Sequence, residues 1–538
     1  MVLWFNMRVD YPYLHIGRAG DIRDGKDRKL YRFLEILPGL SAWLTLVLIV
    51  ILSFLAPFFM ALFIIAFDIY WLIKTVYLSL HLRVAYNKLR ENSKINWLDK
   101  LNTLSPSAYE ILNTKYNIQI KSWQDIYQII FLPLYKESYE IVSASLGGLL
   151  KTNYPKSKMM IVLCWEERGG DETRQVAEAI EKNYKNDFLE FMSVMHPAGL
   201  PDEIPGKGSN TAYAAGYVRE HVVPRLNGGS TSAAGRIIVS NFDIDTVVSP
   251  EYFGVLTYTF LTTPDPLRAS YQPIPLYVNN IWEAPSFARV VAFSATFWHT
   301  IKQERPESAT TFSSHSMSWQ ALEDVGFWQK NMVSEDSRIF WQCFLRYNGS
   351  YRVVSLYYPV SMDANVAPTT LGTLKNVYKQ QRRWAYGVEN VPYFLFGFIK
   401  NKLIPLKKKL YYGFIAAEGN HSWSTNAVIL FLLGWLPVVV GGPEFNKTVL
   451  SFNLPYFTRT IMTLAMLGLV SSAVLSIVLL PPRPPQFGRF KHFLMILQWL
   501  LFPITTILLG AIPALDAQTR LMIGRYMGFW VTPKSRRS

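Results

Sequence analysis

The chain has 538 residues, half of them hydrophobic, and a formal net charge of +15. This length is too great for one ordinary domain, so we expect at least two units. The two cysteines, Cys164 and Cys343, lie far apart in apolar surroundings, which excludes a disulfide framework and favours buried thiols in a reducing compartment. The basic residues flank apolar runs, as at a surface facing anionic headgroups. We therefore expect a lipid bilayer, and no nucleic acid, among the partners.

The first 80 residues contain the first membrane-associated run. We assign residues 1–33 to a cytoplasmic N-terminal segment and residues 34–80 to a transmembrane hairpin of two spans, joined near Ala56 and Pro57. One helix crosses the bilayer core in about 20 residues, so this run is long enough for two. It is too long, and starts too far from Met1, for a cleaved signal peptide. Lys and Arg on both flanks predict that the flanks, and the domain that follows, are cytoplasmic.

The middle of the chain, residues 81–390, alternates strand-like and helix-like segments. This alternation predicts an α/β domain with a mainly parallel sheet, helices on both faces and ligands at the carboxyl ends of the strands. The strand-like runs are 128–132, 159–165, 188–195 and 236–242, and the helical periods are 140–150 and 171–184.

The rest of the chain returns to the membrane. Residues 391–423 mix aromatic, leucine and lysine residues, which favours amphipathic helices in the interface over the alternative of a solvated basic loop. Residues 424–515 contain about three further spans, at 424–440, 461–480 and 493–515.

Three spans would place the C-terminal segment, residues 516–538, outside, with its basic residues on the wrong side. Either the last run, which Pro503 and Pro513 interrupt, is re-entrant, or one more crossing exists.

Candidate site residues follow the predicted strands. Asp243 and Asp245 come directly after the fourth strand, where an extended backbone aims both carboxylates the same way. Mg²⁺ or Mn²⁺ takes one or two such carboxylates and completes its shell with water and phosphate oxygens. This pattern predicts a metal–diphosphate site, with a solvated acidic turn as the alternative. Lys207, in Gly206-Lys-Gly208, offers a cation beside backbone amides, but alone it also fits a turn.

Two motifs further along carry chemistry of a different kind. Glu335 and Asp336 precede a helical segment, where they suit either the positive end of the helix dipole or a general base for a sugar hydroxyl. In Gln380-Gln-Arg-Arg-Trp384 the arginines suit a diphosphate and the tryptophan suits a sugar ring. A Trp–Arg cluster at the membrane interface is the equal alternative.

In this order, the motifs resemble glycosyltransferase family 2, specifically the membrane-integrated branch that includes cellulose, chitin and hyaluronan synthases. The resemblance covers roughly residues 125–390 and the membrane-flanked layout. The tail Gly528-Phe-Trp-Val-Thr-Pro-Lys534 is similar to the F-x-V-T-x-K gating loop of cellulose synthases. The resemblance implies an α/β GT-A-type (Rossmann-like) cytoplasmic domain inserted between α-helical transmembrane segments.

The resemblance also implies residue roles. Asp336 matches the catalytic base, Asp243 and Asp245 match the metal ligands, and Glu335, Trp384 and His315 fall at the acceptor. His315 stands in a Ser/His-rich stretch that matches no particular synthase, and a hydrogen-bonded structural histidine is an equal alternative. The residues implied to bind the nucleotide sugar are Tyr135, Glu137, Glu167, Lys207, Asp243, Gln380 and Arg383.

Two departures from the family pattern stand out. Glu166-Glu167 and Arg168 replace Asp-Asp-Gly, which implies altered recognition of the base, and Ser334 replaces Thr.

The implied activity is inverting transfer of a sugar from a nucleoside diphosphate sugar, of the UDP type, to a growing polysaccharide, with Mg²⁺ or Mn²⁺ and with translocation across the membrane. The alternative is transfer of one sugar to a lipid-linked acceptor. A transporter with a regulatory cytoplasmic domain is remote, because only Asp68 lies well inside a predicted span. We expect a multi-pass protein of the cell membrane, and the sequence identifies no protein partner.

Overall fold

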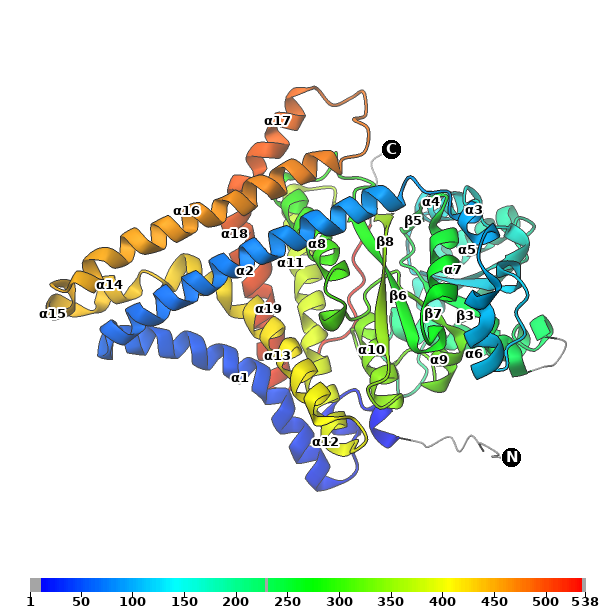
Figure 1. Ribbon diagram of the computed structural model, residues 1–538, viewed down its shortest axis with the longest axis horizontal. Helices are drawn as coiled ribbons and strands as arrows, with labels where there is room; N and C mark the ends of the chain where they lie inside the picture. Colours follow the sequence, from blue (N-terminus) through cyan, green and yellow to red (C-terminus); the bar gives the residue numbers. More distant parts are fainter. Residues whose placement is uncertain (1–10, 228–230, 535–538) are drawn as a thin grey trace.

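The computed structural model describes residues 11–227 and 231–534, which form an α/β domain and a set of long helices extending from it (Figure 1). The eight strands form one sheet in the order β3-β2-β1-β4-β7-β6-β8-β5. The strands are β1 (Tyr127–Leu134), β2 (Met159–Glu166), β3 (Glu190–His196), β4 (Ile237–Asn241), β5 (Val247–Val248), β6 (Ala269–Tyr277), β7 (Ser316–Ser318) and β8 (Arg352–Met362).

The sheet is mixed, whereas the sequence predicts a mainly parallel one. Strands β3, β2, β1 and β4 are parallel neighbours, and so are β6 and β8. Strand β7 is antiparallel to both β4 and β6, and β5 is antiparallel to β8. The antiparallel strands have three and two residues, too few for a hydrophobic period to reveal them.

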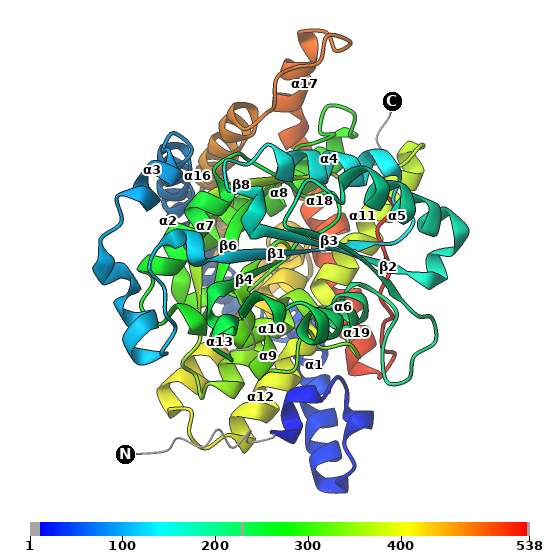
Figure 2. The ribbon, with the colours of Figure 1, turned by 90° about the vertical axis from the view of Figure 1, so that its right-hand side faces the viewer.

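Helices cover both faces of the sheet because alternate strand residues enter different cores. Ile129 and Phe131 pack with helices α6, α9 and α10, whereas Ile130 and Leu132 pack with α4, α5 and α7 (Figure 2). The helices of the domain are α3 (Trp97–Asn102), α4 (Tyr139–Leu150), α5 (Gly170–Tyr184), α6 (Lys207–His221), α7 (Tyr252–Thr262), α8 (Ser286–Gln303), α9 (Trp319–Asp324), α10 (Glu335–Arg346), α11 (Thr370–Ala385) and α12 (Asn390–Lys400).

The remaining helices flank the domain in sequence. Within the described residues, four helical segments are long and apolar enough to cross a membrane: Gly25–Leu55, Pro57–Asn92, Val449–Val478 and Phe490–Met522. The individual helices are α1 (Gly25–Leu55), α2 (Pro57–Asn92), α13 (Leu406–Val428), α14 (Leu436–Val440), α15 (Gly442–Asn446), α16 (Val449–Val478), α17 (Phe490–Leu497), α18 (Phe502–Thr506) and α19 (Ile512–Met522).

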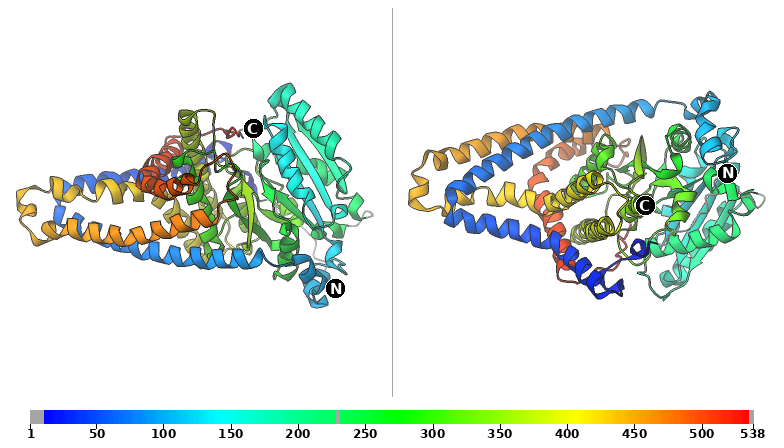
Figure 3. Two further views of the ribbon diagram at one scale, coloured as in Figure 1. Left: turned by 90° about the horizontal axis from the view of Figure 1, so that it is seen from above. Right: turned by 60° about the horizontal axis from the view of Figure 1, so that its bottom comes forward.

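These helices do not all run in one direction. Helices α1, α2, α13–α14 and α16 extend away from the domain, whereas the run from α17 to α19 lies across them at their base (Figures 1 and 3). The lengthwise helices thus form two hairpins, one turning at Ala56 and one at α15. After this crosswise run the chain returns to the α/β domain, where Lys534 pairs with Asp245.

The segment expected to lie in the interface divides into two different helices. The aromatic residues of α12 are buried in the domain, where Phe394 stacks on Trp341 with ring centroids 4.3 Å apart. Helix α13 instead leaves Leu406, Leu410 and Phe414 more than 60% exposed. The exposed apolar face of α13 fits a membrane boundary, and α12 belongs to the core of the α/β domain.

Candidate active site

Charged side chains from four parts of the chain meet at the carboxyl end of β4. Lys207 is the first residue of α6, Asp243 follows β4, and Asp336 lies in the first turn of α10. The Lys207 Nζ donates to Asp243 Oδ1 at 2.7 Å and to Asp336 Oδ1 at 2.9 Å. The structure therefore brings together three residues that are separated by up to 129 positions in the sequence.

The ion pairs determine the charge states. Burial opposes the charge of Lys207, which is 7% exposed, but Asp243 and Asp336 outweigh burial and raise the pKa of the ammonium above its ordinary value. Burial would raise the pKa of Asp243, yet Lys207 and Lys534 together hold it well below its usual range. At neutral pH Lys207 is therefore an ammonium and Asp243 is a carboxylate. Lys207 is thus not part of a solvated turn.

Asp245 has a different partner, which comes from the C-terminal segment. Its carboxylate is 2% exposed and forms an ion pair with Lys534. The backbone N–H of Asp363, after β8, donates to Asp245 Oδ2 at 3.0 Å. Burial raises the pKa of Asp245, with Asp363 and Asp243 adding to the effect and Lys534 opposing it. Such burial excludes the alternative of a solvated acidic turn.

The C-terminal segment reaches this point by packing along α6 and α11. A Cβ added at Gly206 would lie 2.6 Å from Phe529 Cγ, so glycine is needed for this close approach. The Arg383 guanidinium lies 4.8 Å from the centre of the Phe529 ring. Trp530 lies under Lys379 at 5.3 Å. These contacts position Lys534 over the carboxylates.

The start of α10 is fixed by buried groups on both sides. Glu389 accepts hydrogen bonds from the N–H groups of Val333 and Ser334 at 3.0 and 2.9 Å, and from the Ser334 hydroxyl at 2.7 Å. Glu335 is 1% exposed, and a Cβ at Gly208 would lie 3.1 Å from its side chain. Burial, with a smaller contribution from the Asp336 charge, raises the pKa of Glu335 to about 8. Glu335 is therefore mostly protonated at neutral pH.

His315 is fully buried beside Asp336. Its Nδ1 lies 2.8 Å from the Phe312 carbonyl oxygen, to which an Nδ1–H donates, and 3.9 Å from Asp336 Oδ1. The Trp328 indole N–H points at Nε2 from 3.5 Å. Burial is the main reason that the pKa of His315 lies below its ordinary value. Of the two alternatives from the sequence, this geometry is that of a neutral, hydrogen-bonded histidine that supports Asp336.

Helix α11 presents Gln380, Arg383 and Trp384 at intervals of three and four residues, hence on one face. Gln380 and Trp384 line a small cavity with Tyr277 and Asp363. The ring of Trp384 lies 5.8 Å from that of Tyr277. Trp384 therefore faces the interior beside the carboxylate cluster, and not the lipid-facing surface.

The loops after β1 and β2 form the other side of the site. Glu137 is buried, and its Oε2 accepts from the Tyr135 N–H at 2.7 Å. Burial raises the pKa of Glu137 to about 7, although Lys534 opposes the shift. The Arg168 guanidinium forms an ion pair with Glu166 and lies 4.0 Å from the centre of the Tyr135 ring.

One predicted nucleotide contact lies apart from the cluster. Glu167 is exposed, and its Oε2 accepts from the Ala198 N–H at 2.9 Å.

Sequence reasoning missed several residues of the site. Asp363 carries the same signal as Asp243, a carboxylate at the carboxyl end of a strand, and would be found once β8 is recognised. Tyr277 is the last residue of β6, so it also lies at the carboxyl end of a strand. Glu389 gives no signal, because it lies in an ordinary helical stretch and acts only through the folded loop at Ser334. The pairing of Lys534 with Asp245 also requires the tertiary structure.

Comparisons with known proteins agree with this geometry. The family model described as "Glycosyl transferase family group 2" matches residues 238–514, just over half of the chain. The poly-beta-1,6-N-acetyl-D-glucosamine synthase of Staphylococcus aureus (strain COL) is 25% identical over 300 residues, which are 55% of this chain and 62% of that protein. The synthase of the same name from Staphylococcus epidermidis is 21% identical over 336 residues, covering 62% of this chain and 70% of that protein.

Among solved structures, a mannosyltransferase from Pyrobaculum calidifontis in complex with GDP-Man and Mn²⁺ is 14% identical with a TM-score of 0.39. The match covers 77% of this chain and 99% of that one.

The family match spans β4, with the carboxylates that follow it, the start of α10 with Asp336, and the α11 face with Trp384. It continues through α16 and into the crosswise helices. An α/β domain between apolar helices, as expected from the sequence, is what the structure contains. The chain belongs to glycosyl transferase family group 2, and its described residues include four helical segments long and apolar enough to cross a membrane.

Proposed function

We propose that the protein transfers a sugar from a UDP-sugar, with inversion, to a growing polysaccharide at the cytoplasmic side of a membrane. The observation that carries this proposal is the Lys207 ammonium, which contacts both Asp243 and Asp336 at the carboxyl end of β4. It joins a diphosphate-type site to a carboxylate suited to accept a proton. The named activity of the staphylococcal relatives makes N-acetyl-D-glucosamine the first sugar to test.

The residues present fit a divalent cation. Asp243 and Asp245 already face a positive charge, since Lys534 forms an ion pair with Asp245 and helps to lower the pKa of Asp243. The described residues contain no cluster of three or more acidic, His or Cys ligands, so the remaining positions suit phosphate oxygens and water. Asp243 and Asp245 would hold Mg²⁺ or Mn²⁺, which supplies positive charge to the diphosphate when bound.

Asp336 is proposed to take the proton from the acceptor hydroxyl. Lys207 Nζ donates to this carboxylate, so the contact must loosen before the carboxylate can accept the proton. A diphosphate bound at Asp243 offers Lys207 a stronger anionic partner. Donor binding would thus draw the ammonium towards the leaving group, where it offsets the growing charge, and leave Asp336 free to act as the base.

The acceptor is proposed to lie along the α11 face. Trp384 and Gln380 line the small cavity together with Asp363 and Tyr277. An aromatic ring beside polar groups is the usual surface for a sugar ring, and a polymer end placed there would direct its hydroxyl towards Asp336.

Replacing Asp336 with Asn tests the catalytic proposal. Asparagine cannot accept the proton, so we expect sugar incorporation to fall by roughly 10²–10⁴-fold. Affinity for the UDP-sugar should stay within a few-fold of the native value, because other residues hold the diphosphate. Both quantities would be measured on the purified protein, with radiolabelled UDP-sugar for incorporation and equilibrium binding for affinity.

The control is Glu140→Gln, which removes an exposed carboxylate from the equivalent second position of α4 and should leave transfer unchanged. Retained turnover in Asp336→Asn would refute the assignment of the base. Loss of nucleotide binding would instead assign Asp336 to the donor site.

The cytoplasmic orientation has its own test. Asp99 and Ser350 are exposed on the domain, and Asn446 is exposed at the α15 tip of the second hairpin. The native thiols of Cys164 and Cys343 are buried, so single introduced cysteines would dominate the signal. In intact cells, a reagent that cannot cross the membrane should label Asn446→Cys and spare Asp99→Cys and Ser350→Cys. Labelling of Ser350→Cys would overturn the orientation.

A further inference from the structure

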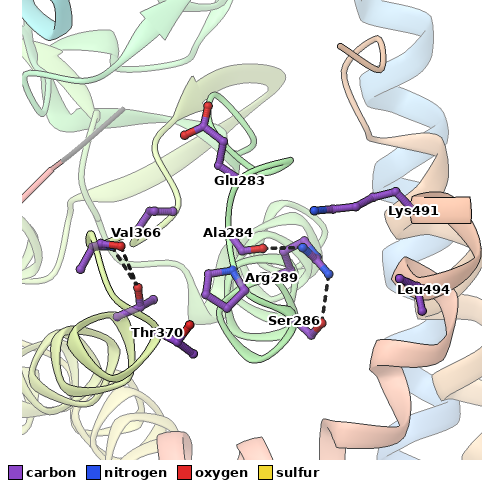
Figure 4. A pocket seen from close by; sticks show the side chains of 11 residues that line it. Glu283, Ala284, Ser286, Arg289, Val366, Thr370, Lys491 and Leu494 are labelled. Atoms are coloured by element: carbon purple, nitrogen blue, oxygen red, sulfur yellow. Dashed lines mark hydrogen bonds between the residues drawn. The ribbon is translucent and has the colours of Figure 1, made fainter. Parts of the chain in front are cut away.

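A cavity of about 350 Å³ lies at the base of the long helices, apart from the carboxylate cluster. Its walls come from the start of α8, the loop before α11 and the first turns of α17 (Figure 4). This volume is at the lower end of the range for small-molecule sites. The lining residues are Glu283, Ala284, Pro285, Ser286, Arg289, Val366, Ala367, Thr370, Thr373, Lys491 and Leu494.

Two cations point toward one another across this cavity. Arg289 extends from α8 and Lys491 from α17, while the carboxyl group of Glu283 points away from both (Figure 4). Their like charges lie close enough to repel. Burial lowers the pKa of Arg289 to about 10, which still leaves the guanidinium charged at neutral pH. The pair therefore concentrates positive charge in a partly enclosed space.

The hydrogen-bond partners of Arg289 are neutral, although the side chain is only 3% exposed. Its Nε donates to Gln498 Oε1 at 2.6 Å, one amino group donates to Ser286 Oγ at 3.1 Å, and the other donates to the Ala284 carbonyl. These partners fix the direction of the guanidinium but do not neutralise it. A buried cation held by neutral groups is costly unless an anion completes the site.

The start of α8 adds a further positive contribution. This helix has 18 residues, its N-cap is Pro285, and it has neither a side-chain cap nor an acidic residue in its first turn. The first N–H groups of the helix are therefore left for water or a ligand. Because Pro285 and Ser286 line the cavity, the positive end of the α8 dipole faces the same space as the two cations.

Helix α17 begins the crosswise run at the base of the hairpins. On its outer face, the side chains of Phe490, Phe493 and Leu497 are 67%, 51% and 42% exposed. The 3-10 turn that follows it, Gln498–Leu501, carries Gln498 and Trp499, which contact Arg289 and Phe297 of α8. A short helix with one apolar exposed face and a basic residue beside it is typical of the headgroup region of a bilayer. The cavity mouth thus lies where lipid phosphates are abundant.

We propose that this cavity binds the phosphoryl group of an anionic membrane lipid, held by Arg289, Lys491, the Ser286 hydroxyl and the N-terminal amides of α8. The ligand chemistry is a phosphate mono- or diester, and the exposed apolar face of α17 makes a bilayer lipid its source. A bound lipid would tie α17 to α8 and to the start of α11, which carries Trp384 at its other end.

Lipid-dependent stability of the purified protein tests the proposal. In a neutral detergent, the midpoint of thermal unfolding would be followed while phosphatidylglycerol or phosphatidylcholine is added. We expect phosphatidylglycerol to raise Tm and phosphatidylcholine to leave it unchanged. The Lys491→Gln variant should need about tenfold more phosphatidylglycerol for the same shift, as expected when one charge-assisted contact is lost.

The matched control is Arg489→Gln, which removes an exposed cation two residues away on the same segment but outside the cavity. It should respond to phosphatidylglycerol as the native protein does. Equal weakening in both variants would show general attraction to a basic surface and would overturn the site. An unchanged response in Lys491→Gln would also overturn it.

One further variant and two soluble phosphate compounds complete the experiment. Arg289→Lys keeps the positive charge while giving up part of the contact with Gln498, and it should respond at lower phosphatidylglycerol concentrations than Lys491→Gln. Inorganic phosphate and glycerol 3-phosphate test for a soluble source. If either raised Tm as much as phosphatidylglycerol at the same concentration, the phosphoryl site would stand and the lipid source would be overturned.

Discussion

In the carboxylate cluster after β4, each lysine lies against carboxylates, with Lys207 at 2.7 Å from Asp243 and Lys534 paired with Asp245. In the cavity under α17, Arg289 and Lys491 face each other, and the partners of Arg289 are neutral. A ligand that binds at the carboxylate cluster must replace ion pairs that already exist. A ligand that binds in the cavity under α17 instead brings the negative charge that Arg289 and Lys491 lack. The two regions should therefore differ in how ligand binding changes stability and activity.

Metal removal should give the largest effect, and this effect should be confined to the carboxylate cluster. Because Asp243 and Asp245 cannot hold a diphosphate without a cation, excess EDTA should abolish sugar transfer, and Mg²⁺ or Mn²⁺ should restore it. The lipid-dependent rise in Tm should survive the same treatment. Full transfer in excess chelator would remove both aspartates from metal binding.

Substitution of Lys534 tests whether a ligand of the carboxylate cluster must replace an existing ion pair. Lys534→Met removes the ammonium that competes for Asp245, so the metal concentration for half-maximal activity should fall by about tenfold, the equivalent of about 1.4 kcal/mol. Lys534→Arg keeps the charge and should need as much metal as the native protein. The measurement is transfer rate against metal concentration at saturating donor. An unchanged requirement in Lys534→Met would mean that the ammonium and the metal occupy different positions.

Replacing Glu335 should give the smallest effect, a change in Tm that depends on pH. Its pKa is about 8 in the folded protein against an ordinary 4.5. The folded state therefore keeps a proton that the unfolded chain releases, and stability is lost as the pH rises from 4.5 to 8. Glu335→Gln should match the native Tm at pH 5 and exceed it by about 2–4 °C at pH 8.

The exposed Glu140→Gln should show no such difference between the two pH values. Parallel pH curves for the native protein and Glu335→Gln would show that Glu335 is ionised in the folded state.

The parallel half of the sheet could be predicted because its signal is local. Strands β1 and β2 are continuous apolar runs, and their observed ends lie within two residues of the predicted ones. Asp243 could be predicted as a candidate because it follows a recognisable strand, and Lys207 because it stands between two glycines. The second half of the sheet gave no such signal, since β5 and β7 are too short for a period and β8 was not recognised.

The remaining features depend on contacts between distant parts of the chain. The last apolar run has the composition of a span, and only its packing against α1, α11 and α13 shows that it lies crosswise. Arg289 and Lys491 are about 200 residues apart, and neither belongs to a motif. No local pattern predicts that two such cations share a cavity.

The position of Lys534 also has a consequence for the order in which the protein becomes active during synthesis. Lys534 and Phe529, which packs against Gly206, follow all the apolar helices in the chain. On the ribosome, the first hairpin and the α/β domain emerge before the second hairpin, and the domain can fold as a unit. Asp245 then has no lysine partner until the second hairpin, the crosswise run and the segment with Lys534 have been made. The site is therefore completed only after the membrane part is in place, so a nascent chain that has not yet inserted its helices lacks a finished site.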